Sequence, residues 1–470
     1  MTFASKAFLF YFFPIFLITY FSFRGVRAKN LIFLAFSLLF YSSSEPVFLV
    51  LLLASITANF FLARAIDVAD NGRRSALLAC GVAANILLLV IFKYTGFFAE
   101  NINTLLSPTH LHIPVPQLTL PLGISFYTFH AISYLADVAK RKVSANRRFD
   151  EFMLYMSMFP QLVAGPIVRY STVAKQLHDR RVTLGRFSAG MRIFVIGLSW
   201  KLLIADQLAP LADAVFDSPH HLSFSQAWLG LYAYSMQIYF DFGGYSAMAV
   251  GLGVMTGFVL PRNFRIPYAA LSITTFWRRW HMSLSTWLRD YVYIPLGGNR
   301  GTRLRTYGNL WIVFLLCGLW HGAGWTFVIW GAYHGLFLVI ERAGLGRLLS
   351  RLPRELAHIY TVLVVFFGWV WFRAADVHAA GRVFSGLFGL NGFGNLQSLT
   401  FLLSPVTIAV LIVAGLLAFW KWPRFRRPKS LQVMSRSAAL MDMTFVAILL
   451  VLSAIAAASA NFSPFLYDRF

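Results

Sequence analysis

His321 lies deep inside an apolar, aromatic-rich stretch from Trp311 to Gly335. A titratable side chain is costly in lipid, and where one occurs there it generally marks a functional site. If Asn309 marks the aqueous boundary, His321 follows roughly 18 Å later along a helix, near the middle of a hydrocarbon core about 30 Å thick. A buried histidine that only hydrogen-bonds to a neighbouring helix would give the same pattern, so His321 alone leaves a structural role open.

The same stretch contains other residues of possible chemical interest. Cys317 precedes His321 by one helical turn and shares its face. A thiolate nucleophile is disfavoured because cysteines in apolar surroundings are usually inert. His334 is interpreted as a packed core histidine, and a role beside His321 is the alternative. Small residues surround the motif and would let a helix or a ligand approach closely: Gly318, Gly322 and Gly324.

A second cluster of chemically capable residues surrounds His281 in the segment Phe276 to Gly301. Arg278, Arg279 and Arg289 lie there among aromatic residues, on what we expect to be the cytoplasmic side. A guanidinium binds phosphate bidentately and stacks on rings, so this cluster suits an anionic, phosphate-bearing partner. Anchoring to lipid headgroups would use the same residues and stays open as the alternative.

The composition of the chain identifies the elements that must position these residues. Of 470 residues, 58% are hydrophobic and only 13% are charged, which is typical of a polytopic membrane protein. The net charge of +23 comes from short basic clusters between apolar spans, the usual form of cytoplasmic loops, so nucleic acid is not an expected partner. The two cysteines, Cys80 and Cys317, both lie in apolar runs and exclude a disulfide framework.

The apolar runs predict an all-α membrane protein of roughly ten to twelve spans. We expect one domain over residues 1–470, with its core motifs in residues 121–335. Phe152 to Val168, broken by prolines and glycine, predicts a re-entrant or interfacial element. The sequence DFGGY at Asp241 to Tyr245 predicts a break in a spanning helix, and Pro261 to Arg305 predicts short interfacial helices.

Several enzyme classes lack any positive signal in the sequence. No Ser-His-Asp order, Walker loop, HExxH motif or CxxC pair is present, and no metal site is expected. A transporter or channel could use an intramembrane histidine and broken helices. That alternative is less favoured, because no inverted repeat is evident and we expect no paired intramembrane charges of the kind an ion-coupled carrier uses.

Five ordered motifs resemble one family. They are PLGISFYTFHAISYLADV, PQLVAGPIVR, YFDFGGYSAMAVGLGVMTGF, FWRRWHMSLSTWLRDYVYIPLGGNRG and GLWHGAGWTFVIWGAYHG. Together they are similar to the membrane-bound O-acyltransferase family, and most to its alginate O-acetylase-like branch. The resemblance implies a fold of spanning, re-entrant and interfacial helices around a central tunnel. RDYVYIPLGGNRG favours this branch over the D-alanyl transferase branch.

The resemblance also implies roles for particular residues. His321 matches the intramembrane catalytic histidine, and His281 matches a second functional histidine on the cytoplasmic side of the tunnel. Tyr467, in the tail NFSPFLYDRF, matches a tyrosine suggested as an acyl relay, although Asp468 stands where the pattern prefers an aromatic residue. Arg278, Arg279 and Arg289 would then meet the phosphates of the donor.

The implied reaction is attack of a hydroxyl group on a thioester, for which a neutral imidazole is the natural base near pH 7. The donor would be an acyl-CoA or an acyl-carrier thioester on the cytoplasmic side, with no bound cofactor. The acyl group, acetyl by resemblance, would reach an extracytoplasmic polysaccharide through a partner acetyltransferase protein. We expect a multi-pass protein of the bacterial cytoplasmic (inner) membrane in contact with its lipids. D-alanyl transfer from a carrier protein is the alternative.

Overall fold

The computed structural model describes residues 1–109, 111–394, 396–419, 436–459 and 465. Within these residues the chain is all-helical and contains no β-strand, as the hydropathy pattern predicts. The chain divides into two compact units, Met1–Met191 with Ala249–Pro261 and Arg192–Met248 with Arg262–Phe470. The expectation of a single domain over residues 1–470 stays a prediction.

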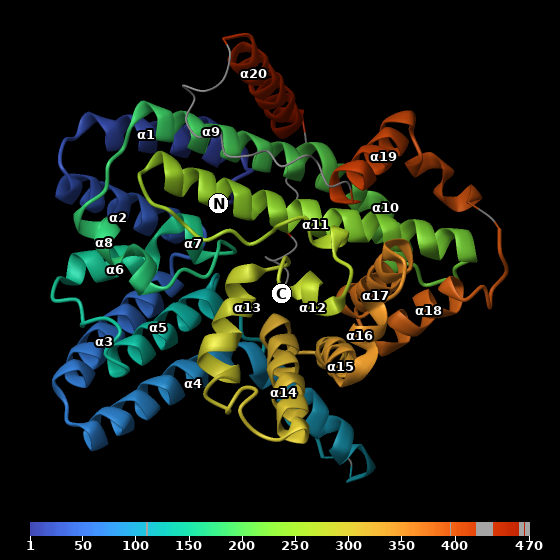
Figure 1. Cartoon of the computed structure of the whole chain (residues 1–470), viewed down its shortest axis with the longest axis horizontal. Helices are drawn as coiled ribbons and strands as arrows, with labels where there is room; N and C mark the ends of the chain where they lie inside the picture. Colours follow the sequence, from blue (N-terminus) through green and yellow to red (C-terminus); the bar gives the residue numbers. More distant parts are fainter. Residues whose placement is uncertain (110, 395, 420–435, 460–464, 466–470) are drawn as a thin grey trace. The chain divides into compact units, whose positions relative to one another are not determined.

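The first unit is built mainly from the helices of the first 191 residues (Figure 1). In chain order these are η1 (Phe8–Phe12), α1 (Phe13–Ser22), α2 (Val26–Ser42), α3 (Phe48–Val68), α4 (Asn71–Leu106), η2 (Ser107–Thr109), α5 (Ile124–Ala139), α6 (Phe149–Ser157), α7 (Phe159–Leu162) and α8 (Tyr170–His178). Two long helices, α9 (Leu184–Ser199) and α11 (Phe224–Met255), contribute residues to both units.

The second unit contains both histidine motifs. Its helices up to the first of these motifs are η3 (Trp200–Ala205), α10 (Asp206–Phe216), η4 (Pro267–Ala269), α12 (Ile273–Trp277), α13 (Met282–Leu288) and η5 (Arg289–Tyr293). Those that follow are α14 (Arg303–His321), α15 (Trp325–Ile340), η6 (Glu341–Leu345), α16 (Gly346–Leu349), α17 (Arg354–Arg373), α18 (Val377–Leu387), η7 (Gln397–Leu402), α19 (Pro405–Phe419) and α20 (Arg436–Ser459). The helices α14 and α15 form a hairpin (Figure 1).

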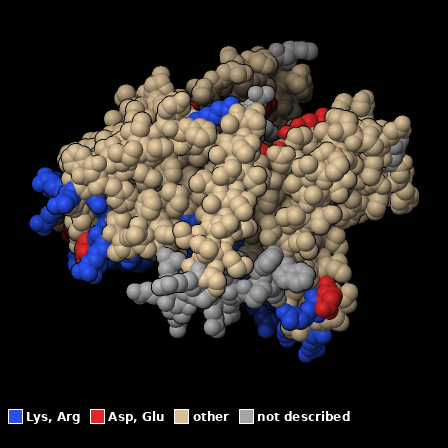
Figure 2. Space-filling model, turned by 90° about the horizontal axis from the view of Figure 1, so that it is seen from above, with Lys and Arg blue, Asp and Glu red and all other residues tan. Residues whose placement is uncertain are grey.

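Five helical stretches among the described residues are long and apolar enough to cross a bilayer. They are Phe48–Val68, Asn71–Thr109, Leu184–Phe216, Arg354–Arg373 and Ala439–Ser459. Most of the surface in the space-filling view carries no charged side chain, and Lys and Arg gather in a few groups (Figure 2). The chain is therefore a multi-pass membrane protein, and the total of ten to twelve spans stays a prediction.

The two segments expected to form short, broken helices do so. After α6 the backbone of Met158 leaves the helical region, and α7 restarts with a proline in its first turn. In the segment from Pro261 to Arg305, the helices η4, α12, α13 and η5 are each seven residues or shorter. The position of these segments at a membrane interface stays a prediction.

The predicted helix break at DFGGY is wrong, because α11 continues through Asp241 to Tyr245 without interruption. The two glycines there serve close helix packing. A Cβ atom on Gly244 would lie 2.6 Å from the carbonyl oxygen of Gly197, and one on Gly243 would lie 3.2 Å from the Trp200 ring. Small residues allow this approach and leave the helical hydrogen bonds of α11 intact.

Candidate active site

The hairpin of α14 and α15 brings two backbones into direct contact. A Cβ atom on Gly318 would lie 2.2 Å from the carbonyl oxygen of Phe327, and one on Gly331 would lie 2.4 Å from that of Phe314. Real Cβ atoms are not found at such distances, so only glycine fits at these two positions. Gly318 therefore serves helix packing, one of the two roles that the sequence allowed for the glycines around His321.

His321 lies at the end of α14, where Gly322 turns the backbone into an extended conformation. The sequence placed this histidine in the middle of a membrane span, whereas it is the last residue of its helix, at the tip of the hairpin. Asn309, taken from the sequence as a boundary to water, is buried and donates to the carbonyl oxygens of Leu296 and Gly298. The expected depth of His321 in the bilayer stays a prediction.

Aromatic rings surround His321, whose side chain is almost fully buried. The ring centroid of His321 lies 4.8 Å from that of Trp320 and 5.1 Å from those of both Trp330 and Phe372. The ring of His281 lies 6.4 Å away, measured between centroids. The two histidines that the sequence singled out, 40 positions apart in the chain, are thus neighbours in one buried cluster.

The backbone of His281 adopts a left-handed conformation, with φ 41° and ψ 54°, just before α13 begins. This conformation is uncommon for residues other than glycine and is frequent at functional sites. Asn263 holds the adjoining backbone on the C-terminal side. Its carbonyl oxygen accepts from the amide of Met282 at 3.0 Å, and its side-chain oxygen accepts from the amide of Ser283 at 3.2 Å. The imidazole of His281 is fully buried against the ring of Phe242, at 4.7 Å between centroids.

His334 belongs to the same aromatic cluster. It is fully buried, and its ring centroid lies 5.1 Å from that of Trp277 and 5.2 Å from that of Trp330, the ring that also contacts His321. A Cβ atom on Gly368 of α17 would lie 2.6 Å from its Nε2 atom. Neither ring nitrogen of His334 has a hydrogen-bond partner in the described part of the chain. These contacts agree with its interpretation as a packed core histidine.

The three arginines proposed from sequence have different environments. Arg278 is exposed, and Arg279 is half-buried and donates to the carbonyl oxygen of Ala269 at 3.2 Å. Burial and the charge of Arg265 lower the pKa of Arg279. The exposed Arg289 pairs with Asp290 at 2.6 Å, and this hydrogen bond raises the pKa of the Arg289 guanidinium. Arg278 is therefore the most accessible of the three for a ligand.

A buried group of charges lies close to the histidines and was missed from the sequence. The ammonium of Lys201 lies 2.8 Å from Asp206 and 2.7 Å from Asp241, and Lys201 and Asp241 are almost completely buried. Asp241 precedes Phe242, which contacts His281. The expectation that paired charges are absent was therefore wrong. The available signal was Lys201 inside the apolar run before Asp206, together with the carboxylate of Asp241 inside a second apolar run.

A second carboxylate that sequence reasoning missed positions α12. Glu341 is buried and accepts from the amides of Ile273 and Thr274 at 2.6 and 2.9 Å. It also accepts from the hydroxyl group of Thr274 at 2.7 Å. These bonds fix the start of the short helix that ends at Trp277, one of the rings against His334.

The remaining sequence candidates are Cys317 and Tyr467. Cys317 is buried on α14, as expected of an inert thiol in an apolar environment. Tyr467 lies outside the described residues. The nearest described residue, Phe465, is buried, with its ring 4.6 Å from both the Lys201 ammonium and the centroid of Tyr245.

Comparisons with known proteins identify the class of this fold and site. The model of MBOAT, the membrane-bound O-acyltransferase family, matches residues 111–373, more than half of the chain. The chain belongs to this family and is a membrane O-acyltransferase.

Curated relatives narrow the class further. The chain is 40% identical to the probable alginate O-acetylase AlgI of Azotobacter vinelandii over 504 residues, with all of both chains covered. It is 40% identical to the peptidoglycan O-acetyltransferase of Helicobacter pylori, over 83% of this chain and 80% of that one. Similarity to the teichoic acid D-alanyltransferase of Bacillus subtilis is weaker, at 29% over 56% of this chain and 68% of that one.

Proposed function

We propose that this protein moves an acetyl group from a cytoplasmic thioester across the bacterial cytoplasmic membrane for O-acetylation of an extracytoplasmic polysaccharide, with alginate as the first candidate. The relatives at 40% identity that are named for O-acetylation of alginate and peptidoglycan support the acetyl group and the polymer. The observation that carries the proposed mechanism is the contact between His281 and His321, whose ring centroids lie 6.4 Å apart.

His321 acts as the general base in this mechanism. Its imidazole takes the proton from an acceptor hydroxyl group while the hydroxyl oxygen attacks the thioester carbonyl carbon. A C–O bond forms, the C–S bond breaks, and the proton passes to the departing thiolate, so that an ester and a free thiol result. General-base catalysis contributes about 10²- to 10⁴-fold, and holding the two reactants together in the central tunnel must supply much of the rest.

His281 binds or orients the donor, and nearby arginines receive its phosphates. Arg278 is the leading candidate because it is exposed and, unlike Arg289, forms no ion pair in the described part of the chain, and Arg279 and Arg289 are further candidates. A coenzyme A thioester and a carrier-protein phosphopantetheine both carry such phosphates. The acyl group then reaches the polymer through an extracytoplasmic or membrane-anchored partner protein, with Tyr467 as a proposed relay.

D-alanyl transfer from a carrier protein is the second candidate function, and the similarity to the teichoic acid D-alanyltransferase favours it over unrelated chemistry. It is ranked below acetyl transfer because the two O-acetylating relatives share more identity with the chain and cover more of it. Both reactions use the same attack of a hydroxyl group on a thioester, so the acyl group found on the product separates them.

The test uses the purified full-length protein in proteoliposomes with acetyl-CoA as donor. Free thiol release and acetyl ester formation on a polysaccharide acceptor are measured in the presence of a candidate extracytoplasmic acetyltransferase. We expect His321→Ala to lose at least about 10²-fold in rate. His378→Ala, which alters an exposed histidine on α18, is the matched control and should retain the wild-type rate.

Three results would count against parts of this proposal. An unchanged rate in folded His321→Ala would remove His321 from the mechanism. D-alanyl esters formed from a charged carrier protein, with none formed from an acetyl donor, would replace acetyl transfer with the second function. Full activity in Tyr467→Phe would assign the relay step to the partner protein.

A further inference from the structure

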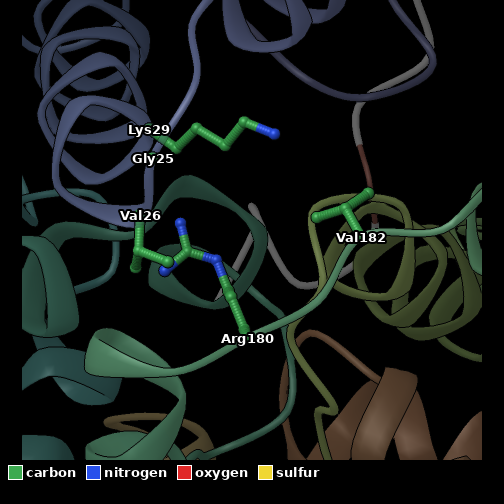
Figure 3. A pocket seen from close by; sticks show the side chains of 5 residues that line it. All are labelled: Gly25, Val26, Lys29, Arg180 and Val182. Atoms are coloured by element: carbon green, nitrogen blue, oxygen red, sulfur yellow. The ribbon is translucent and has the colours of Figure 1, made fainter.

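A small cavity in the first unit lies far along the chain from either histidine motif. Its volume is about 120 Å³, and it is lined by Gly25, Val26, Lys29, Arg180 and Val182 (Figure 3). One buried water needs roughly 10–15 Å³ by this kind of measure, so the cavity has room for a group of several heavy atoms. Lys29, on α2, and Arg180, in the segment after α8, both line this cavity (Figure 3).

Arg180 is a buried cation held entirely by neutral groups. Its guanidinium donates to the side-chain oxygen of Asn30 at 2.6 Å, the hydroxyl group of Tyr20 at 3.1 Å and the carbonyl oxygen of Thr256 at 3.1 Å. Only 8% of the residue is exposed. Its Nη2 atom makes a single hydrogen bond within the described chain, to Tyr20, which leaves one of its two N–H groups for a ligand.

Lys29 adds a second positive charge to the cavity. Its ammonium lies 5.2 Å from the centroid of the Tyr20 ring. Partial burial and the charge of Arg180 lower the pKa of Lys29. Neither cation forms an ion pair with a carboxylate in the part of the chain that the structure describes. The nearest acidic residue in sequence, Asp179, is exposed and does not line the cavity.

Two neighbouring cations without a counter-charge are costly when partly removed from water, and an anion in the cavity would offset that cost. The N-terminus of α2 also favours an anion in the cavity. Its N-cap is Gly25, with φ +85° and no side chain to accept from the first amide groups. These amides and the helix dipole favour an anion. The guanidinium geometry specifically suits the oxygens of a phosphate group.

We propose that this cavity binds one phosphate group, carried either by an anionic phospholipid or by a soluble phosphate compound, through Lys29 and Arg180. The recognition chemistry is the same for both sources: a tetrahedral oxyanion between an ammonium and a guanidinium. This site is separate from the histidine cluster and does not depend on the proposed acetyl transfer.

The test measures binding by the full-length protein purified in a phosphate-free detergent and buffer. The probes are inorganic phosphate, phosphatidylglycerol and, as a lipid without phosphate, dioleoylglycerol. Native mass spectrometry counts bound probe, and the shift of the unfolding temperature reports affinity. Lys29→Gln removes one cation from a partly exposed position, Lys29→Arg retains it, and Lys175→Gln removes an exposed lysine of α8 as a charge-matched control.

We expect phosphate or phosphatidylglycerol, and not dioleoylglycerol, to bind and stabilise the wild type. Binding should weaken at least tenfold in Lys29→Gln and persist in Lys29→Arg and Lys175→Gln. Stabilisation by phosphatidylglycerol alone assigns the site to a lipid headgroup, and stabilisation by inorganic phosphate assigns it to soluble phosphates. Equal binding by wild type and Lys29→Gln, or no difference between dioleoylglycerol and the phosphate-bearing probes, would overturn the proposal.

Discussion

His130 in the first unit and His321 in the second are both buried on helices rich in aromatic residues, but their ring environments differ. The Nε2 atom of His130 accepts a hydrogen bond from the amide of Val168 at 3.2 Å. Among the described residues its ring has one aromatic contact, with Tyr155 at 5.8 Å between centroids. An imidazole nitrogen occupied by a backbone amide cannot take a proton from a substrate without losing that bond. His130 therefore has the features of a structural histidine.

His321, in contrast, lies among rings and beside another histidine. The ring centroids of Trp320, Trp330 and Phe372 lie within 5.1 Å of its own, and that of His281 lies at 6.4 Å. Burial alone does not distinguish a catalytic histidine from a structural one, because both residues are buried. Two differences are informative: His321 has a second histidine, His281, nearby, and the backbone of His281 is strained. Such a conformation costs about 1–3 kcal/mol and persists only where the surrounding structure imposes it.

The largest expected effect on the rate of acetyl transfer comes from removing either His281 or His321. His281→Ala should lower the rate of acetyl transfer by about 10²-fold or more, as should His321→Ala, because each removes part of one reacting assembly. The double variant should be little slower than the slower single variant, since residues that act as a unit are strongly non-additive.

Initial rates for the two single variants and the double variant measure this coupling, with the unfolding temperature of each as the control for folding. Rate losses that multiply in the double variant would show that the histidines act independently. The proximity of His281 to His321 would then not explain why His321, and not His130, is catalytic in the proposed mechanism.

A smaller effect is expected from Asn263→Ala, which leaves His281 in place but removes one of the bonds that fix its backbone. The side-chain oxygen of Asn263 accepts from Ser283, and its loss should cost roughly tenfold in kcat, in line with about 1–1.5 kcal/mol for one hydrogen bond. Asn263→Asp keeps the acceptor oxygen and should recover most of the rate. An equal loss in both variants with an unchanged unfolding temperature would exclude this positioning role.

The hairpin that holds His321 can be tested through its stability. Gly331→Ala places a methyl group 2.4 Å from a backbone oxygen, so α14 and α15 must separate, at a cost of about 1–3 kcal/mol in the free energy of unfolding. Gly308→Ala, at a helical position of α14 with open space around it, should be neutral or slightly stabilising. Thermal unfolding in detergent compares the two, and equal unfolding temperatures would contradict the packing role.

Much of the fold could be predicted from the sequence because apolar runs, prolines and glycine pairs determine the conformation of the segment that contains them. The helical class, a break within Phe152 to Val168 and the short helices after Pro261 were all predicted in this way. The helix break at DFGGY was predicted wrongly, because glycine has two uses that sequence does not separate. Gly244 provides room for Gly197, a residue on another helix whose proximity only the fold reveals.

In the candidate site, too, residues recognisable from local sequence were predicted, and residues that depend on contacts distant in the chain were missed. His281 and His321 were singled out from residue type and motif resemblance, but the contact between their rings was not predicted. Asn263, Glu341 and Lys201 were missed because each acts through a partner distant in sequence. The sequence around an asparagine or a carboxylate does not show which buried backbone amide, distant in the chain, will donate a hydrogen bond to it.

The smallest expected effect on activity comes from the structural histidine of the first unit. His130→Leu keeps a similar side-chain volume but removes the acceptor for the amide of Val168, which should cost about 1–3 kcal/mol in the free energy of unfolding. The rate per folded molecule should stay at the wild-type level, because no reacting group is lost. Thermal unfolding and initial rates, normalised to folded protein, give both quantities. A rate loss as large as that of His321→Ala, with an unchanged unfolding temperature, would place His130 in the reaction, and the presence of a neighbouring histidine would no longer distinguish the two buried histidines.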